Sequence, residues 1–432
     1  MHRSADDGNA PRRVDRSPER VLRYILPRTS RPPSTTGLVM IGGGARGAYQ
    51  AGVLQGLAAI LGTRVRNRPL FDVLTGTSAG AINAAYVASK ADRMADGIAG
   101  LAALWSELQI DDVVRVDVTS LLSIGSRWLR DLTVGGMLAA KRRANHLLDT
   151  TPLRELLAAQ ISVEAIHRHV ANDMLRGFGV SATSYHTGTA VTFFDGHESV
   201  APWTRNARVG RRTRIALDHI LASASIPLLF RPVPIDGAFY GDGGVRMATP
   251  LSPAIHLGSD KIVAISVQHR RGGDGIVPPS GESDAASDIS IADIAGVMLD
   301  AALLDDLESD AERLLRVNQT LALIDAKRRS HHPDGLRAIP LLVIRPSVDL
   351  GALAADQFKR MPAMLRYLMK GIGASEGRGV EFLSYLAFDP SYTRPLIEIG
   401  RKDALSQKDE IEAFFFGSAA WIEAAEHIPR AG

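Results

Sequence analysis

The chain has 432 residues, of which 45% are hydrophobic and 22% are charged, and this composition is that of a globular protein with one large or two ordinary domains. A formal net charge of only +3 gives no indication of nucleic-acid binding. The absence of cysteine excludes disulfides, thiolate chemistry and cysteine-ligated zinc.

The first 36 residues are polar and rich in proline and arginine, and they lack the apolar segment that a signal peptide needs. We predict a disordered basic arm over residues 1–36 and a cytoplasmic protein. No apolar run in the chain reaches the roughly 18–20 residues of a membrane span. We therefore expect any contact with a membrane to be peripheral.

A buried strand is predicted at residues 37–41, followed by a glycine-rich turn at residues 42–47 and a helix over residues 48–61. The turn reads GGGARG, and its backbone amides would converge at a helix N-terminus. Such a cradle binds anions. The pattern G-x-G-x-x-G fits a dinucleotide site, and exposed glycine amides fit an oxyanion hole. A dinucleotide site needs an acid about 20 residues later, and residues 58–69 contain none.

Residues 70–89 predict a second unit of strand, turn and helix. The turn is Gly76-Thr77-Ser78-Ala79-Gly80, which fits the G-x-S-x-G nucleophile elbow. An elbow presents its serine hydroxyl at the end of a sheet, over a helix N-terminus. Because both turns follow parallel strands, we expect the glycine amides and Ser78 to share one edge of the sheet.

A third motif ends the strand predicted at residues 238–242. Asp242 is followed by Gly243 and Gly244, so its carboxylate would stand on a tight turn. Asp236 begins a similar Asp-Gly-Ala sequence. We favour Asp242 as the functional acid, because Asp236 precedes the strand that brings Asp242 to the sheet edge.

The remaining chain alternates between helical and extended patterns. Helices are predicted at residues 98–108, 134–148, 152–157, 218–227 and 291–324, and strands at 178–183, 190–194, 260–267 and 340–346. Trp105, Trp128 and residues 121–122 fit an acyl-chain channel or ordinary core, and we favour core.

Two basic segments fit contact with a lipid surface. Five arginines lie between residues 205 and 214, and residues 357–370 form a basic amphipathic helical pattern. We favour a solvated loop for the arginine segment and a helix packed on the domain for residues 357–370.

Together the three motifs resemble those of the patatin-like phospholipase family, in the same order, over roughly residues 37–268. The resemblance implies an acyl hydrolase domain at 37–268, with a three-layer α/β/α fold around a mostly parallel sheet. After this domain we expect a flexible linker at 269–289. We then expect a mostly helical C-terminal extension at 290–432 that packs on the core.

The resemblance also implies a role for each motif residue. Ser78 would be the nucleophile, and Asp242 its sole activating partner, without a histidine. The oxyanion hole would be formed by Gly42, Gly43, Gly44, Ala45, Arg46 and Gly47. The elbow and the Asp-Gly-Gly turn would be supported by Gly76, Gly80, Gly243 and Gly244. The implied substrate is a phospholipid, a lysophospholipid or a related acyl ester, and neither cofactor nor metal is implied.

Two other hypotheses remain. An ordinary α/β-hydrolase triad would combine Ser78 and Asp242 with His256 or His269. A lipid-binding protein without activity would use the basic segments on the same fold.

Overall fold

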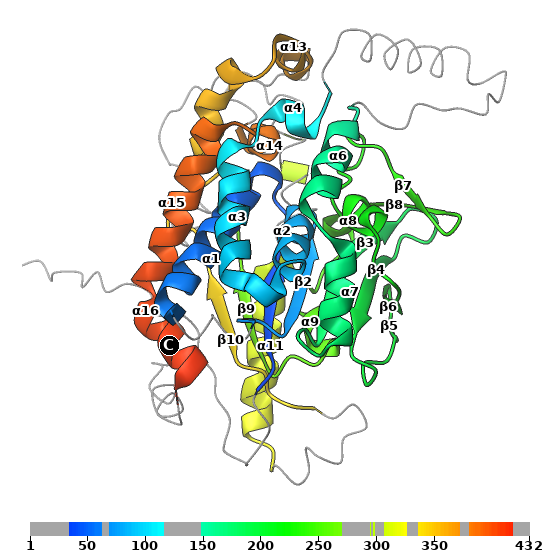
Figure 1. Ribbon diagram of the computed structural model, residues 1–432, viewed down its shortest axis with the longest axis vertical. Helices are drawn as coiled ribbons and strands as arrows, with labels where there is room; N and C mark the ends of the chain where they lie inside the picture. Colours follow the sequence, from blue (N-terminus) through cyan, green and yellow to red (C-terminus); the bar gives the residue numbers. More distant parts are fainter. Residues whose placement is uncertain are drawn as a thin grey trace, which may run out of the picture.

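The computed structural model contains one mixed β-sheet with helices on both of its faces (Figure 1). Ten strands belong to this sheet in the part of the chain that is described. The described residues are 34–62, 69–115, 148–269, 294, 297–298, 306–325, 336–371 and 380–417.

Five neighbouring parallel strands form the centre of the sheet. In spatial order they are β10 (Leu341–Ile344), β9 (Lys261–Ile265), β1 (Thr36–Met40), β2 (Val73–Thr77) and β3 (Gly177–Ser184). Strand β1 pairs with β2 up to Met40 opposite Gly76, so the two strands end at the same edge. That edge therefore carries both the glycine-rich turn and the serine turn.

Five further strands extend the sheet beyond its parallel centre through four antiparallel pairs and one parallel pair. The strands concerned are β4 (Ala190–Gly196), β5 (Trp203–Arg205), β6 (Arg208–Arg212), β7 (Val233–Ile235) and β8 (Ala238–Asp242). Strand β4 occupies one side of β3, and β2 occupies the other as far as Thr77 opposite Ser181. Strand β8 pairs with β3 immediately after that point, with Asp242 opposite Ala182. Asp242 therefore arrives just beyond the end of β2.

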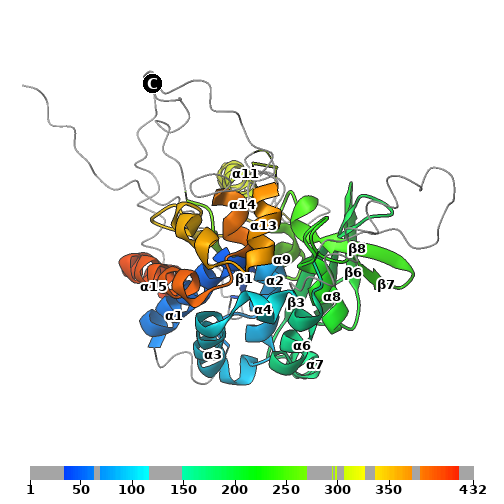
Figure 2. The same ribbon diagram turned by 90° about the horizontal axis from the view of Figure 1, so that it is seen from above.

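Helices cover both faces of the sheet, as the two views in Figures 1 and 2 show. Helices α1 (Gly47–Leu61), α2 (Ala79–Ala88) and α3 (Met94–Glu107) lie on one face, and α9 (Ser252–His256) and α11 (Asp306–Ala322) lie on the other. The remaining helices of the first two thirds are α4 (Ile110–Val113), α6 (Thr151–Gln160), α7 (Val163–Ala171) and α8 (Leu217–Ser223). Short 3-10 turns are η1 (Gly44–Arg46), η3 (Ala91–Arg93) and η4 (Gly243–Val245). The three-layer α/β/α prediction is confirmed.

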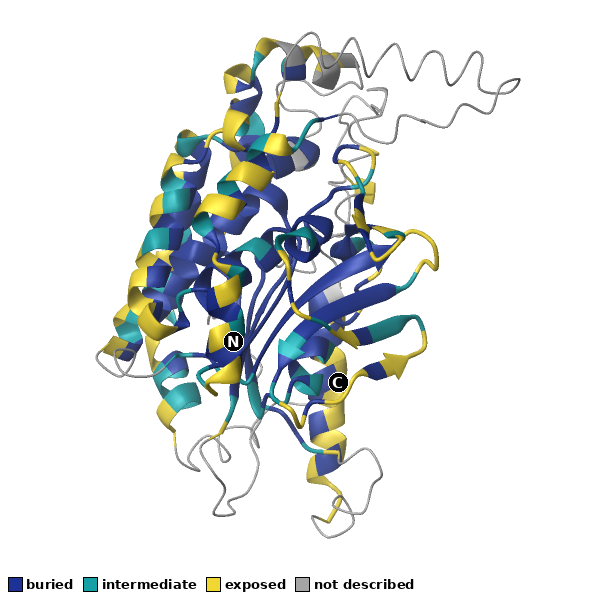
Figure 3. Cartoon of the chain, turned by 45° about the vertical axis from the view of Figure 1, so that its right-hand side comes forward, coloured by how far each residue is buried: buried dark blue, intermediate teal, exposed yellow. Residues whose placement is uncertain are grey.

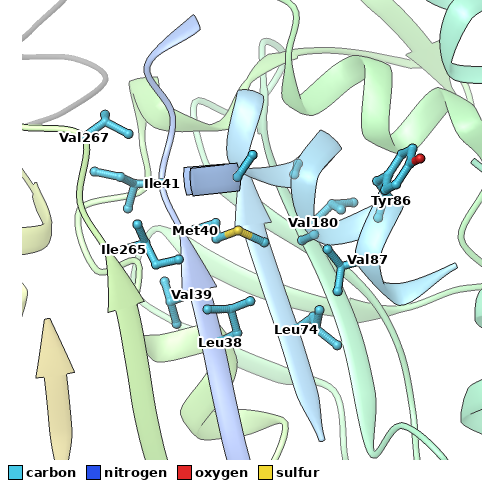
Figure 4. Close-up of a cluster of buried hydrophobic side chains, with 14 of the residues drawn as sticks. Leu38, Val39, Met40, Ile41, Leu74, Tyr86, Val87, Val180, Ile265 and Val267 are labelled. Carbon is cyan, nitrogen blue, oxygen red and sulfur yellow. The ribbon is translucent and has the colours of Figure 1, made fainter. Parts of the chain in front are cut away.

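Strands β1, β2 and β3 are buried along their whole length, so their side chains are apolar or small (Figure 3). In Figure 4 the side chains of Leu38 and Met40 from β1 lie beside Leu74 of β2, with Val87 of α2 and Ile265 of β9 in the same cluster. Burial on both faces fixes the strands, and with them the turns at the sheet edge.

The C-terminal region adds to the same body. Its elements are η6 (Ala352–Arg360), α13 (Ala363–Gly371), α14 (Val380–Leu386), α15 (Pro390–Ser406) and α16 (Lys408–Phe416). Helix α15 packs on α1 through glycines: a Cβ on Gly52 would overlap the carbonyl oxygen of Ile397, and one on Gly400 would overlap that of Tyr49. The contact of the C-terminal region with the core is therefore close along both helices.

Several predicted elements occur where the sequence indicates them. The hairpin at 178–183 and 190–194 is β3–β4, the helix at 98–108 is α3, and the strand at 340–346 is β10. The predicted helix at 134–148 lies almost wholly outside the described residues, as do Trp128, residues 121–122, the arm at 1–33 and the linker.

The single helix predicted at 357–370 is wrong. The segment divides into η6, which ends at Arg360, and α13, which begins at Ala363. Met361 between them is extended, with φ −63° and ψ 147°. Pro362 is the cause, because the residue before a proline is disfavoured in the helical region and proline itself lacks an amide donor.

Candidate active site

The turn between β2 and α2 holds Ser78 in a strained conformation. Its φ is 56° and its ψ is −128°, a region that residues with a side chain rarely adopt. A Cβ on Gly76 would overlap the carbonyl oxygen of Gly80, and one on Gly80 would overlap that of Met40. These two glycines let the strand and helix cross closely enough to force the turn. The geometry is that of a nucleophile elbow.

A serine on helix α8 supports the turn that holds Ser78. The amide of Ser78 donates to Oγ of Ser223 over 3.0 Å, and that hydroxyl donates to the carbonyl of Ser181 over 2.6 Å. Ser223 is fully buried. Sequence reasoning missed Ser223, since only its presence in a helix ending in small residues distinguishes it.

The glycine-rich turn also needs glycine at specific positions. Gly43 has φ 147° and Gly44 has φ 56°. A Cβ on Gly44 would overlap the carbonyl oxygen of Tyr385. The turn closes on itself, because the amide of Arg46 donates to the carbonyl of Gly43 over 3.1 Å. Helix α1 begins at Gly47, directly after this turn.

Buried amide side chains fix both ends of this turn. Gln50 Nε2 donates to the carbonyl of Ile41 over 2.8 Å, and Asn83 Nδ2 donates to the carbonyl of Gly47 over 3.0 Å. Asn83 Nδ2 also donates to Oε1 of Gln50, and Trp105 Nε1 donates to Oδ1 of Asn83 over 2.8 Å. The network is satisfied and buried, so it holds the turn rigidly. Sequence reasoning missed it, although a polar residue inside an apolar helix was a visible signal.

Arg46 belongs to the turn but is not among the residues that line the cavity beside Ser78. Its side chain is buried, and its Nε donates to Oγ of Ser384 on α14 over 2.8 Å. The guanidinium also lies over the ring of Tyr385, 5.0 Å from the ring centroid. This geometry favours support of the loop by the Arg46 side chain over direct contact of that side chain with an oxyanion.

Asp242 is a completely buried carboxylate at the end of β8. Its Oδ1 accepts the amide of Gly244 over 2.9 Å, and its own amide donates to the carbonyl of Ser225 over 2.8 Å. Burial raises the pKa of Asp242 from 3.8 to about 7, while the Ser78 side chain and the Gly244 amide lower it. The carboxyl group is therefore poised to exchange a proton near neutral pH.

Ser78 and Asp242 are adjacent without a completed hydrogen bond. The serine side chain is close enough to act on the pKa of Asp242, yet Oδ2 of Asp242 is buried and has no partner among the described residues. Catalytic hydrogen bonds are often longer than usual before substrate binds.

Tyr185 also lies near this carboxylate. A Cβ on Gly241 would overlap the Tyr185 hydroxyl, so the phenol lies directly over the residue before Asp242. Burial, followed by the charge of Asp242, raises the pKa of Tyr185 to about 12. Tyr185 therefore stays protonated, as a neutral hydroxyl beside the site, at any ordinary pH.

The competing acid and the candidate histidines all have other partners. Asp236 is exposed and pairs with Arg211 over 2.7 Å. His256 Nδ1 contacts the carbonyl of Ser252 at 2.8 Å, and the ring stacks on a tryptophan. His269 Nδ1 contacts the carbonyl of Pro346 at 2.9 Å. This arrangement favours Asp242 over Asp236 and gives no support to a histidine triad.

A narrow apolar cavity of about 50 Å³ lies beside Ser78. It is bounded by Gly44 and Ser78 at the reactive end and by aliphatic and aromatic side chains from α3, α4, α6 and the segment after α8. Trp105, Phe230 and Phe388 are among them. Trp105 therefore lines the cavity and also belongs to the buried hydrogen-bond network. The sequence predicted a core side chain, and the structure adds these two contacts.

Other candidate ligand features are weaker. The described residues contain no group of three or more side chains suited to a metal ion. Nor does any helix in the described part of the chain have the length and apolar character needed to cross a membrane. In the arginine segment, Arg211 pairs with Asp236 and Arg214 with Glu164. That segment is therefore partly neutralised.

A sequence model of the patatin-like phospholipase family matches residues 38–255. The match covers half of the chain and contains all three motifs, and the chain belongs to this family.

Three solved structures show a fainter likeness. They are VipD from Legionella pneumophila (11% identity, TM-score 0.33), the type III effector ExoU (12%, 0.32) and human GIVD cytosolic phospholipase A2 bound to methyl gamma-linolenyl fluorophosphonate (12%, 0.33). The alignments cover 88%, 88% and 87% of this chain. They cover only 67%, 54% and 60% of those structures, respectively.

Proposed function

We propose that the chain is a serine acyl hydrolase that cleaves acyl esters of phospholipids or lysophospholipids with a dyad of Ser78 and Asp242. The observation that carries this proposal is the unpartnered, buried oxygen of Asp242 beside a strained serine. Ser78 lines a narrow apolar cavity whose aliphatic and aromatic side chains suit contact with a fatty acyl chain. Family membership supports a lipid as the substrate.

In the first half of the reaction, the carboxylate of Asp242 accepts the hydroxyl proton while Oγ of Ser78 attacks the ester carbonyl carbon. The amides of the glycine-rich turn stabilise the resulting oxyanion. When the tetrahedral intermediate collapses, the alcohol leaves and takes the proton from Asp242. An acyl-serine remains.

In the second half, Asp242 accepts a proton from water, and the hydroxide attacks the acyl-serine. A second oxyanion forms in the same position. Its collapse releases the fatty acid and returns the proton from Asp242 to Ser78. One aspartate thus serves both half-reactions, and a histidine has no step to perform.

A fluorophosphonate ester tests the nucleophile directly. We expect one covalent adduct on Ser78, detected by peptide mass spectrometry, because phosphonylation follows the same attack and displaces fluoride. Ser89→Ala is a matched control, since Ser89 is buried at the other end of α2 and bonds to the carbonyl of Tyr86. A folded protein without an adduct would indicate the lipid-binding hypothesis instead.

The pH dependence tests the base. Because only ionised Asp242 accepts the proton, we expect kcat/KM to rise about tenfold per pH unit below its pKa and to level off above it. The midpoint should lie near the pKa of about 7.

Replacing both His256 and His269 by glutamine should leave this profile unchanged. Loss of activity in that folded double variant would support the histidine triad and contradict the dyad.

For access to lipid, we infer peripheral contact through the end of the molecule that carries α4 and α13 (Figure 1). Val113 of α4 lines the cavity, and Tyr367 of α13 exposes 71% of its surface. Lys370 is also exposed on α13. An amphipathic aromatic and a lysine are suited to the interface of an anionic bilayer.

A further inference from the structure

A residue far outside the family-matched region reaches the proposed oxyanion loop. Ser384 of α14 accepts a hydrogen bond from Arg46 Nε at 2.8 Å, and 338 residues separate the two in sequence. Ser384 is fully buried, and Arg46 is only 3% exposed. A hydrogen bond between two buried polar groups is costly to break, because neither regains water.

The neighbouring residue contacts the same loop from the same helix. The Tyr385 ring lies under the Arg46 guanidinium, and the Tyr385 carbonyl lies where a Cβ of Gly44 would be. Helix α14 therefore contacts the loop at two points, the side chain of Arg46 and the backbone of Gly44, and both contacts restrict movement of the loop.

The Arg46 side chain and the loop backbone are mechanically connected. The Arg46 amide donates to the carbonyl of Gly43, so a shift of Arg46 moves the peptide units at 43–46. Gly44, which belongs to this stretch, lines the same cavity as Ser78. Oxyanion donors act only within a narrow range of distance, about 2.7–3.1 Å from the developing charge.

We propose that Ser384 is a positioning residue for the hydrolase reaction: by holding Arg46 it keeps the amides of the glycine-rich turn aimed at the oxyanion. The proposal rests on the function proposed above. It gives the C-terminal region a part in the chemistry that goes beyond packing, since α14 completes the support of the loop.

Ser384→Ala removes the acceptor and leaves the helix intact. We expect kcat to fall by about 10- to 100-fold, since a misplacement near 1 Å costs about that much, while KM changes less than about twofold. The rate is expressed per active site, counted by the endpoint of fluorophosphonate labelling, so unfolded protein is excluded from the count.

Thr393→Val provides a matched control for lost stability. Thr393 is fully buried in the neighbouring helix α15, and its hydroxyl donates to the carbonyl of Asp389 at 3.2 Å, a local bond that involves neither Arg46 nor Ser384. We expect a lower thermal midpoint in this variant with kcat per active site unchanged.

A double-variant comparison shows whether Ser384 acts through Arg46. Arg46→Lys keeps the charge and loses Nε, so the pair Arg46→Lys with Ser384→Ala should be no slower than Arg46→Lys alone. An unchanged kcat in Ser384→Ala, or fully additive losses in the pair, would overturn the positioning role. Either result leaves the proposed function intact if Ser78→Ala is inactive, so the two proposals fail separately.

Discussion

Replacing Ser78 with alanine is expected to lower kcat for ester hydrolysis by about 10⁴-fold or more, to the level of the uncatalysed reaction. The reason is chemical: alanine leaves no oxygen to form the acyl-enzyme. The measurement is release of fatty acid from lysophospholipid, with folding followed by circular dichroism.

The cost of Ser78→Ala to stability should be small, because the two neighbouring glycines allow the tight turn and the Ser223 bond uses the amide of Ser78 rather than its hydroxyl. Ser89→Ala serves again as the control and should retain activity. Hydrolysis by purified, folded Ser78→Ala above about 1% of the normal rate would remove Ser78 from the mechanism.

Replacing Asp242 with asparagine is expected to lower kcat by about 10³-fold or more, because the amide cannot accept the serine proton. The matched control is Asp236→Asn, which changes the other Asp-Gly turn. Asp236 is exposed and paired with Arg211, so this control should keep near-normal kcat. If the two variants exchanged these outcomes, Asp236 would be the base.

Asp242→Asn should also make the protein more stable at alkaline pH. Below about pH 4 the Asp242 carboxyl is protonated in the folded and unfolded chains alike. Between pH 4 and 7 only the unfolded chain ionises, because burial raises the folded pKa to about 7. Each pH unit in this window then lowers the free energy of unfolding by up to about 1.36 kcal/mol.

Asparagine does not titrate, so the free energy of unfolding of the variant does not fall through this ionisation. Urea unfolding at pH 5 and at pH 8 would measure the difference. A gain in stability at pH 8 combined with lost activity would show that the wild-type carboxylate is maintained for function at a cost in stability.

The backbone of the candidate site was predictable because its conformational requirements appear in the sequence. Gly43, Gly44, Gly76 and Gly80 occupy positions where a Cβ would overlap other atoms, and such positions leave a recognisable pattern of small residues. The sheet edge that they share follows from parallel strand pairing. Ser78 and Asp242 were located by the same motifs.

The supporting residues were harder to predict because their partners are distant in sequence. The bond from Ser78 to Ser223 spans 145 residues, and nothing near Ser223 or Ser384 marks either as special. Asn83 and Gln50 were identifiable in principle, as polar residues in apolar helices. The break at Pro362 was also visible, but the amphipathic pattern around it outweighed the proline.

The long separation between Arg46 and Ser384 has a consequence for the order in which the protein is made. The ribosome completes the elbow and the glycine-rich turn early, but another 300 residues or so must follow before Ser384 exists. A nascent or truncated chain would therefore carry the reactive serine without the support of its oxyanion loop. On the proposed mechanism, full activity would therefore require that synthesis has passed residue 384.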